Sequence, residues 1–309
     1  MAKHIIKISI LVVWVALLGW WWHESRSWPV PEKIEAAFLP NYYDYFDLKF
    51  GDQKIGWVVK GLRRLRSGSY QCTQGMTVQV KVMNQVVEIK SNSIVQMDHM
   101  LNIVSYQYLV QAGPLNMVES GKVENERLTV NVNLGQHGPI LEDILEKYGA
   151  ILGEYAQMLD FSQDVESQAP TGPGLAQAVP PYLSYLGFEV GRSYSMSLID
   201  IGSRRPVRTN VRIVAEERQY DPDLGREVPV YQIAVGSGEN VDLTWADRYG
   251  RTLKEESVGF SLARVRDMSE AAAGITPLVP PIRLTSVFKR EDLDKLLKAV
   301  TESGKARQD

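Results

Sequence analysis

The sequence predicts a mainly β protein in which a curved antiparallel sheet, or half-barrel, carries a central helix. Three observations lead to this prediction. Hydrophobic residues alternate with polar ones over most of residues 42–275, turn-forming residues separate the alternating runs, and one internal stretch changes to helical spacing. One N-terminal transmembrane helix and a short C-terminal helix complete the predicted fold.

Residues 42–138 form the first predicted run of antiparallel strands. Its alternating series are Met76-Val78-Val80-Val82, Val104-Tyr106-Tyr108-Val110 and Leu128-Val130-Val132-Leu134. Turns are expected at Gly51-Asp52, at residues 83–85 and at residues 112–114, where Gly, Asn and Pro gather. Because alternate side chains of a strand point to opposite faces, each of these strands presents one apolar face to a core.

Residues 188–275 form the second predicted run. Its series are Tyr194-Met196-Leu198, Tyr231-Ile233-Val235 and Val241-Leu243-Trp245, and Asp221 to Gly225 is the predicted tip of a hairpin. The two runs weakly resemble each other, since the segment from Asp98 to Val104 is similar to the segment from Asp247 to Leu253. This similarity favours two β sublayers joined by the central helix.

The residues between the two runs, 139–187, are predicted to hold the helix and a crossover. From Leu141 to Leu159, apolar residues recur at helical spacing after Pro139, whereas Glu166 to Pro181 is rich in Pro, Gly, Ala and Gln and predicts a loop. Residues 276–309 follow the second run as a Pro-rich exit and a short helix from Arg290 to Ser303.

The N-terminal residues 1–23 predict a membrane anchor. The apolar stretch from Ile5 to Trp22 has eighteen residues, nearly enough to cross a hydrocarbon core of about 30 Å. Lysines precede it and three tryptophans end it, which places the N-terminus in the cytoplasm and the bulk of the chain outside. Residues 24–41 are a connector. The alternative is a signal peptide cleaved after Ser27.

Composition and motifs exclude several classes of function. The net charge of −3 gives no overall attraction to nucleic acid, and the single cysteine, Cys72, excludes an internal disulfide. Four scattered histidines form no pattern of metal ligands, and the chain has no nucleophile elbow, P-loop or dinucleotide-binding motif. We therefore expect neither a metal nor a cofactor, and a protein that is not an enzyme.

Two groups of side chains are candidates for binding. The first is a soft, aromatic-rich lining of the curved sheet, suited to an acyl chain, and it contains Met76, Val78, Tyr106, Tyr108, Tyr194 and Met196. The second comprises two arginine pairs, Arg64 with Arg66 and Arg208 with Arg212, each expected to share a strand face and to contact lipid head groups or a partner. The alternatives are a plain hydrophobic core and a solvated outer face.

Two segments carry a resemblance to a known architecture. Phe46 to Trp57 resembles the opening hairpin of uncharacterised bacterial envelope β proteins, and Val241 to Leu253 resembles their later Trp-x-Asp-x-x-Gly hairpin. Those proteins are similar to the LolA/LolB-like periplasmic half-barrels, which cup lipid or lipoprotein acyl chains. The layout of one anchor before a β domain is also similar to LptC. The resemblance implies the bacterial inner membrane, with most of the chain in the periplasm, and carries over no catalytic residue.

These observations predict a membrane-anchored periplasmic β protein that binds a lipid or a partner protein in envelope assembly or transport, without catalysis. One alternative is a structural scaffold subunit of an inner-membrane complex that has no ligand cavity. The other is a hydrolase with a carboxylate site that no motif reveals.

Overall fold

The computed structural model describes residues 39–82, 85–112, 115–133, 165–170, 172–200, 204–237 and 240–279. In these residues a single 14-stranded sheet has the order β8-β7-β6-β5-β4-β3-β2-β1-β14-β13-β12-β11-β10-β9. Its first strands are β1 (Tyr42–Phe50), β2 (Gln53–Arg64), β3 (Tyr70–Val82), β4 (Gln85–Met97), β5 (Ile103–Ala112), β6 (Leu115–Glu124), β7 (Arg127–Asn133) and β8 (Val165–Gln168). The others are β9 (Ser193–Asp200), β10 (Arg205–Asp221), β11 (Arg226–Ser237), β12 (Asn240–Ala246), β13 (Thr252–Ser257) and β14 (Phe260–Val265).

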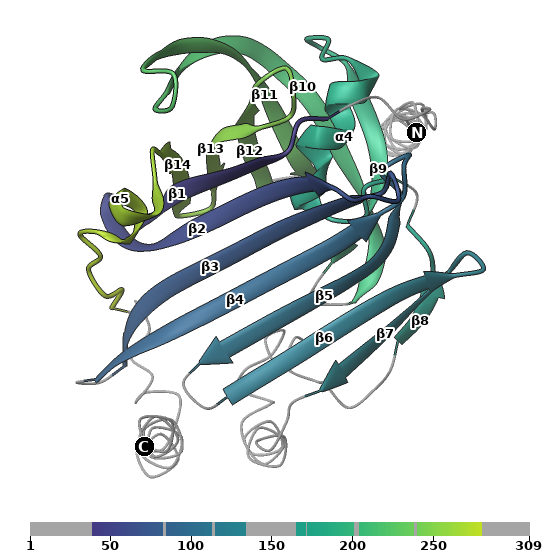
Figure 1. Ribbon diagram of the computed structural model, residues 1–309, viewed down its shortest axis with the longest axis horizontal. Coiled ribbons are helices and arrows are strands. Elements are labelled where there is room, and N and C mark those ends of the chain that lie inside the picture. The colour runs from purple at the N-terminus through teal and green to yellow at the C-terminus, as the bar shows by residue number, and fades with distance from the viewer. Residues whose placement is uncertain are drawn as a thin grey trace, which may run out of the picture.

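The sheet is antiparallel throughout and curves around its own concave face (Figure 1). The mainly β prediction is thus confirmed, but the two predicted runs are not separate sublayers. β1 pairs with β14 from Tyr45↔Val265 to Phe50↔Phe260, so the first and last strands of the chain join the runs in one sheet. Sequence similarity between hairpins could not reveal this pairing, because it depends on contacts between distant parts of the chain.

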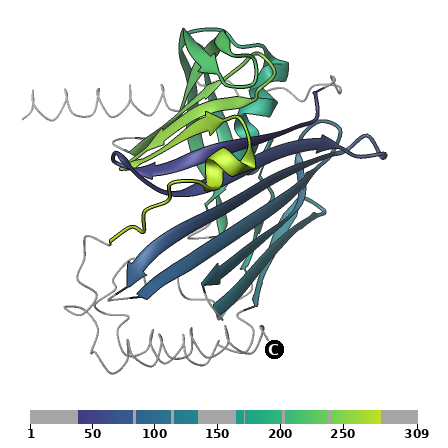
Figure 2. The ribbon, with the colours of Figure 1, turned by 60° about the vertical axis from the view of Figure 1, so that its left-hand side comes forward.

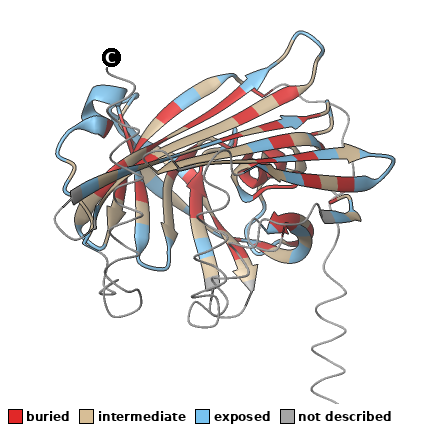
Figure 3. Cartoon of the chain, turned by 90° about the horizontal axis from the view of Figure 1, so that it is seen from below, coloured by how far each residue is buried: buried red, intermediate tan, exposed pale blue. Residues whose placement is uncertain are grey.

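The concave face holds the hydrophobic core, and buried and exposed positions alternate along the strands as expected (Figure 3). A short helix, α4 (Val179–Leu186), and the 3₁₀ turn η2 (Ala176–Ala178) fill one end of it. Val179 and Leu183 are fully buried there against residues of both runs, such as Val95 and Ile213.

The helix α4 corrects the loop predicted up to Pro181. Pro180 and Pro181 lie in its first turn, where backbone N–H groups have no acceptor within the helix, so proline is tolerated there. The helix predicted from Leu141 to Leu159 lies outside the described residues, as do the anchor, residues 24–38 of the connector and the C-terminal helix. Among the helices that the structure describes, none is long and apolar enough to span a membrane.

The segment between β8 and η2 lies between strands of the two runs. The N–H of Ile103 in β5 donates to the carbonyl of Gly172 (3.2 Å), and the N–H of Ile199 in β9 donates to the carbonyl of Gly174 (2.7 Å). Residues 172–174 therefore lie between β5 and β9, the edge strand of the second run.

Two features differ from the predicted strands: a bulge in β5 and a C-terminal segment that packs against β1 to β3. The register of β4 and β5 shifts between Gln96 and Met97, which leaves Val104 as the extra residue of a bulge, and Val104 is exposed. At the other end of the chain, the helix α5 (Met268–Ala272) packs near β1 and β2 (Figure 2). Leu278 then pairs with β3 through Gln79 and Lys81, beside the part of β3 that extends past β2.

Candidate functional site

The concave face is organised in rows of directly paired residues that run across β1 to β6. One apolar row packs against α4 and consists of Tyr42, Leu62, Cys72, Val95, Tyr106 and Gly121. The next row is polar in every strand and consists of Asp44, Lys60, Gln74, Ser93, Tyr108 and Glu119; we call it the polar row. A polar row between apolar rows divides the concave face into two compartments.

Beyond the polar row, the concave face is apolar again. Its centre is a group of five partly exposed side chains from four neighbouring strands, which we call the open-end patch: Met76, Val78, Ile89, Val110 and Met117. The patch lies at the opposite end of these strands from α4. Methionine and aliphatic side chains adapt to irregular apolar shapes, so such a surface suits a flexible hydrocarbon chain.

The structure divides the predicted lining between the two compartments. Met76 and Val78 belong to the open-end patch, and Tyr108 lies beside it in the polar row. Tyr106, Tyr194 and Met196 instead lie at the α4 end, where each is at most 5% exposed. The prediction is corrected for these three residues, because α4 already occupies the space they face.

The predicted arginine pairs lie away from the concave face. Arg208 and Arg212 share the convex face of β10 and are exposed, as expected, and the Nε–H of Arg208 donates to the hydroxyl of Ser195. Arg64 is the last residue of β2, whereas Arg66 lies in the turn before β3. The shared strand face predicted for Arg64 and Arg66 is therefore wrong, because the strand ends between them.

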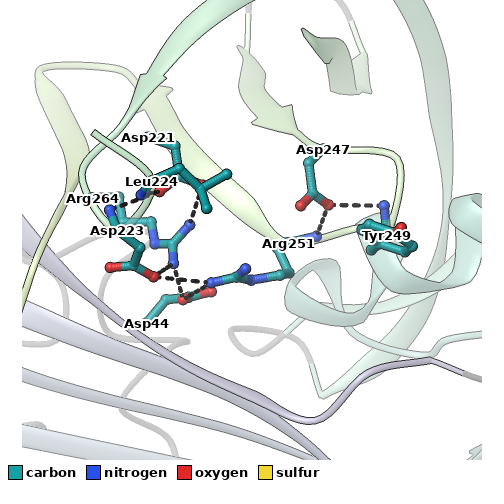
Figure 4. A network of polar contacts seen from close by, with 8 residues as sticks. All are labelled: Asp44, Asp221, Asp223, Leu224, Asp247, Tyr249, Arg251 and Arg264. Carbon is teal, nitrogen blue, oxygen red and sulfur yellow. Dashed lines mark hydrogen bonds and ion pairs between the residues drawn. The ribbon is translucent and has the colours of Figure 1, made fainter. Parts of the chain in front are cut away.

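An ionic network surrounds the Asp44 end of the polar row (Figure 4). One carboxylate oxygen of Asp44, Oδ1, lies 2.8 Å from the Nη2 of Arg264 in β14 and 2.9 Å from the Nη2 of Arg251 before β13. Arg264 also binds Asp221 (3.3 Å) and Asp223 at the tip of the β10–β11 hairpin. The hairpin tip is thereby fastened to β1 and β14, although β12 and β13 lie between them in the sheet.

The other charged members of the polar row are paired as well. Lys60 donates to the carboxylate of Glu255 in β13, and Glu119 accepts a hydrogen bond from the hydroxyl of Tyr106 at 2.7 Å. Glu119 also lies 3.5 Å from the Nε of Arg204, in the turn before β10, and both side chains are at most 5% exposed. This ion pair joins β6 to the turn between β9 and β10, and so holds opposite ends of the sheet together.

Burial determines the ionisation of these groups. It raises the pKa of the carboxyls of Asp44 and Glu119, and the nearby arginines only partly offset this effect. Burial also raises the pKa of the Cys72 thiol to about 12, so this thiol is not a nucleophile at neutral pH. In the described part of the chain, no three His, Cys, Asp or Glu side chains form a group that could hold a metal ion.

Sequence reasoning missed the polar row. The sequence did contain evidence for it. By alternation, Asp44 is expected on the same strand face as Phe46 and Leu48, and Glu119 on the same face as Met117. A charged residue at a position where alternation predicts an apolar one indicates a buried, paired charge.

Comparison with known proteins finds a resemblance to a solved structure. No protein-family model matches the chain, and no curated protein matches its sequence. A solved structure, a β-barrel-like protein of the domain of unknown function DUF1849 from Brucella abortus, is 12% identical. That comparison covers 74% of this chain and 96% of the other, with a TM-score of 0.49. The likeness carries no information about the site.

Proposed function

We propose that this chain is a non-catalytic binding protein of the bacterial cell envelope that holds an acyl chain on the open-end patch. The observation that carries the proposal is the partly exposed apolar surface formed by Met76, Val78, Ile89, Val110 and Met117 on the concave face. Burying such a surface against a hydrocarbon chain contributes roughly 25 cal/mol per Å² of apolar area.

The ion pairs of the concave face support binding rather than catalysis. Asp44, Glu119 and Glu255 each lie against a cation, namely Arg264, Arg204 and Lys60 respectively. A carboxylate that acts as an acid or base needs access to a substrate, whereas each of these carboxylates is held by a cation. The hydrolase alternative therefore receives no support from this part of the chain.

The proposed location at the bacterial inner membrane rests on the sequence. The predicted anchor from Ile5 to Trp22 and the resemblance to LolA/LolB-like half-barrels support attachment to the outer side of the inner membrane. We expect Arg208 and Arg212, which are exposed on the convex face, to contact anionic head groups or a partner protein while the acyl chain is held on the concave face.

Photolabelling of the full chain in native membranes tests the proposal. A fatty acid that carries a diazirine group in its chain is added, activated by light, and its attachment sites are mapped by mass spectrometry. We expect labels on β3 to β6, at residues of the open-end patch. The Ile89→Glu variant, which places a charge in the patch, should lower this labelling at least tenfold.

The matched control is Val86→Glu in the same strand. Val86 is 56% exposed and points to the convex face, so the same charge there should leave labelling unchanged. Within the sheet, labelling away from the concave face, or equal labelling of the two variants, would reject the proposal and favour the scaffold hypothesis.

A further inference from the structure

A small cavity lies where the polar row meets η2. It is lined by Tyr42, Asp44, Phe46, Lys60, Gly61, Cys72, Thr73, Gln177 and Thr252, and it has room for about one water-sized group. Phe46 belongs both to this cavity and to the apolar cluster that contains Met76 and Val78. The cavity is therefore adjacent to the open-end patch.

Two polar atoms of the cavity residues are buried without a hydrogen-bond partner among the described residues. One is Oδ2 of Asp44, whose side chain is 1% exposed and whose Oδ1 alone receives the two arginines. The other is Nε2 of Gln177, whose Oε1 accepts a hydrogen bond from the hydroxyl of Ser93 at 3.0 Å. A buried polar atom without a partner is costly, so these two atoms indicate a missing group.

The chemistry of the two atoms restricts the group that could satisfy both. As a carboxylate beside two arginines, Asp44 accepts hydrogen bonds at Oδ2, whereas Gln177 Nε2 can only donate them. A hydroxyl satisfies both, because it donates through its proton and accepts through its oxygen. A carboxylate would offer no proton to Asp44, and an ammonium would offer no acceptor to Gln177.

The surrounding charges also disfavour an anionic group. Lys60 is paired with Glu255, while Arg251 and Arg264 are shared among Asp44 and the two carboxylates of the hairpin tip. Three carboxylates share these two arginines, so an additional buried anion would have no cation left beside it, and desolvating an unpaired charge is strongly unfavourable.

We propose that this cavity binds the hydroxyl of an uncharged amphiphile, between Asp44 Oδ2 and Gln177 Nε2, while the acyl chain of that amphiphile lies on the open-end patch. The inference rests on the proposed function and deepens it by assigning the head group and its orientation. The head group points toward α4, and the hydrocarbon chain extends toward the far ends of β3 to β6.

The test compares two photoactivatable ligands with the same diazirine-bearing chain, a monoacylglycerol and a free fatty acid, on the full-length protein in native membranes. We expect the monoacylglycerol to reach half-maximal labelling of the open-end patch at a concentration at least tenfold lower. Gln177→Met removes the amide donor while keeping the length of the side chain, and should reduce this preference to about twofold. Gln79→Met, on the convex face of β3, should leave the preference unchanged.

Unlabelled competitors identify the source of the hydroxyl. Displacement by a monoacylglycerol supports a glycerol hydroxyl, and displacement by an alkyl glycoside supports a sugar hydroxyl. Equal labelling by both probes, with Gln177→Met unchanged, would overturn the hydroxyl site and leave the proposed function standing. If neither probe labels the patch, both proposals fail.

Discussion

At the scale of single residues, the Glu119–Arg204 ion pair connects parts of the sheet that are far apart in strand order. Both side chains are buried, and the hydroxyl of Tyr106 donates a hydrogen bond to Glu119 as a second contact. Removing one partner of such a pair leaves a buried charge poorly compensated, which typically costs about 3–5 kcal/mol. Arg204 also has a φ of 57°, an unusual conformation for a residue with a side chain, which the surrounding contacts hold in place.

We therefore expect Glu119→Gln to lower the free energy of unfolding by about 3 kcal/mol or more, measured by urea denaturation. Glu124→Gln is the control, because Glu124 pairs with Lys122 and both side chains are about two-thirds exposed (65% and 67%). Glu124→Gln should change the free energy of unfolding by no more than about 0.5 kcal/mol. Similar losses for the two variants would contradict the structural role of the buried pair.

Asp44 leads to a prediction about pH. Because burial raises its pKa in the folded protein, the folded state binds a proton more readily than the unfolded state. Stability contributed by Asp44 is therefore greatest at low pH and decreases as pH rises through the raised pKa. We expect the stability of the wild type relative to Asp44→Asn, measured by urea denaturation, to increase as pH falls from 7 to 4. If this stability difference stays constant or decreases as pH falls, the pKa of Asp44 is not raised in the folded protein.

The environment of a single residue could be predicted from the sequence where its neighbours come from the same strand, but not where they come from distant segments. Alternation placed Met76 and Val78 on the concave face, and it placed Tyr106, Tyr194 and Met196 there as well. It could not separate the two groups, because α4 covers only one end of the face. Nor could it identify the arginine partners of Asp44, the nearer of which lies 207 residues away in the chain.

At the scale of elements, the similarity between the two runs reappears as two turns of the same construction. Asp98 Oδ1 accepts the N–H groups of Met100 and Asn102 (2.8 and 2.9 Å). Asp247 Oδ1 accepts those of Tyr249 and Arg251 (2.8 and 3.0 Å). In both turns the residue three positions after the aspartate has positive φ: Leu101 at 61° and Gly250 at 75°. The Trp-x-Asp-x-x-Gly hairpin thus encodes a turn.

Gly250 also positions α4. A Cβ atom there would lie 2.6 Å from the carbonyl oxygen of Pro180 and from the Cα of Pro181, both backbone atoms that cannot easily move. Gly250→Ala should therefore lower the melting temperature more than Gly225→Ala, whose φ is also positive but whose Cβ would meet nothing within 4 Å. We expect Gly225→Ala to lower the free energy of unfolding by about 1–2 kcal/mol. Gly250→Ala should lower it by about 1–3 kcal/mol more.

Calorimetry of the two variants provides the comparison, since both carry the same kind of backbone strain and differ in the contact with α4. Equal losses would show that α4 yields to the added methyl group. Strands and turns could be predicted because their signals are local, as at Gly51 and Gly225. The helix α4 could not, because its prolines resemble those of a loop and its helical form depends on burial of Val179 and Leu183.

At the scale of the whole molecule, the pairing of β1 with β14 makes one sheet from two runs of strands. β1 has the second run on one side and β2 on the other, so it lies in the interior of the sheet. A sheet of this kind is expected to unfold as a unit, because the two runs share both a ladder and the core around α4. Sublayers that were independent would open separately.

Hydrogen exchange of the full chain, followed with increasing urea, tests this cooperativity. Ala263 in β14 pairs with Asp47 on one side and Lys254 on the other, so Ala263→Pro disturbs an interior strand, where proline is poorly tolerated. We expect the most protected amides of β3–β4 and of β10–β11 to lose protection by the same free energy, about 3 kcal/mol or more. Ser167→Pro in the terminal strand β8 should affect β7 and β8 alone.

The result bears on function because the proposed ligand surface belongs to the first run, whereas the residues that fasten its polar row, Arg264, Arg251 and Glu255, belong to the second. If both runs lose protection together, the concave face is a property of the whole sheet, and disturbing β14 should also reduce acyl labelling of the open-end patch. If only the second run responds to Ala263→Pro, the first run holds its shape alone, and labelling of the patch should survive the substitution.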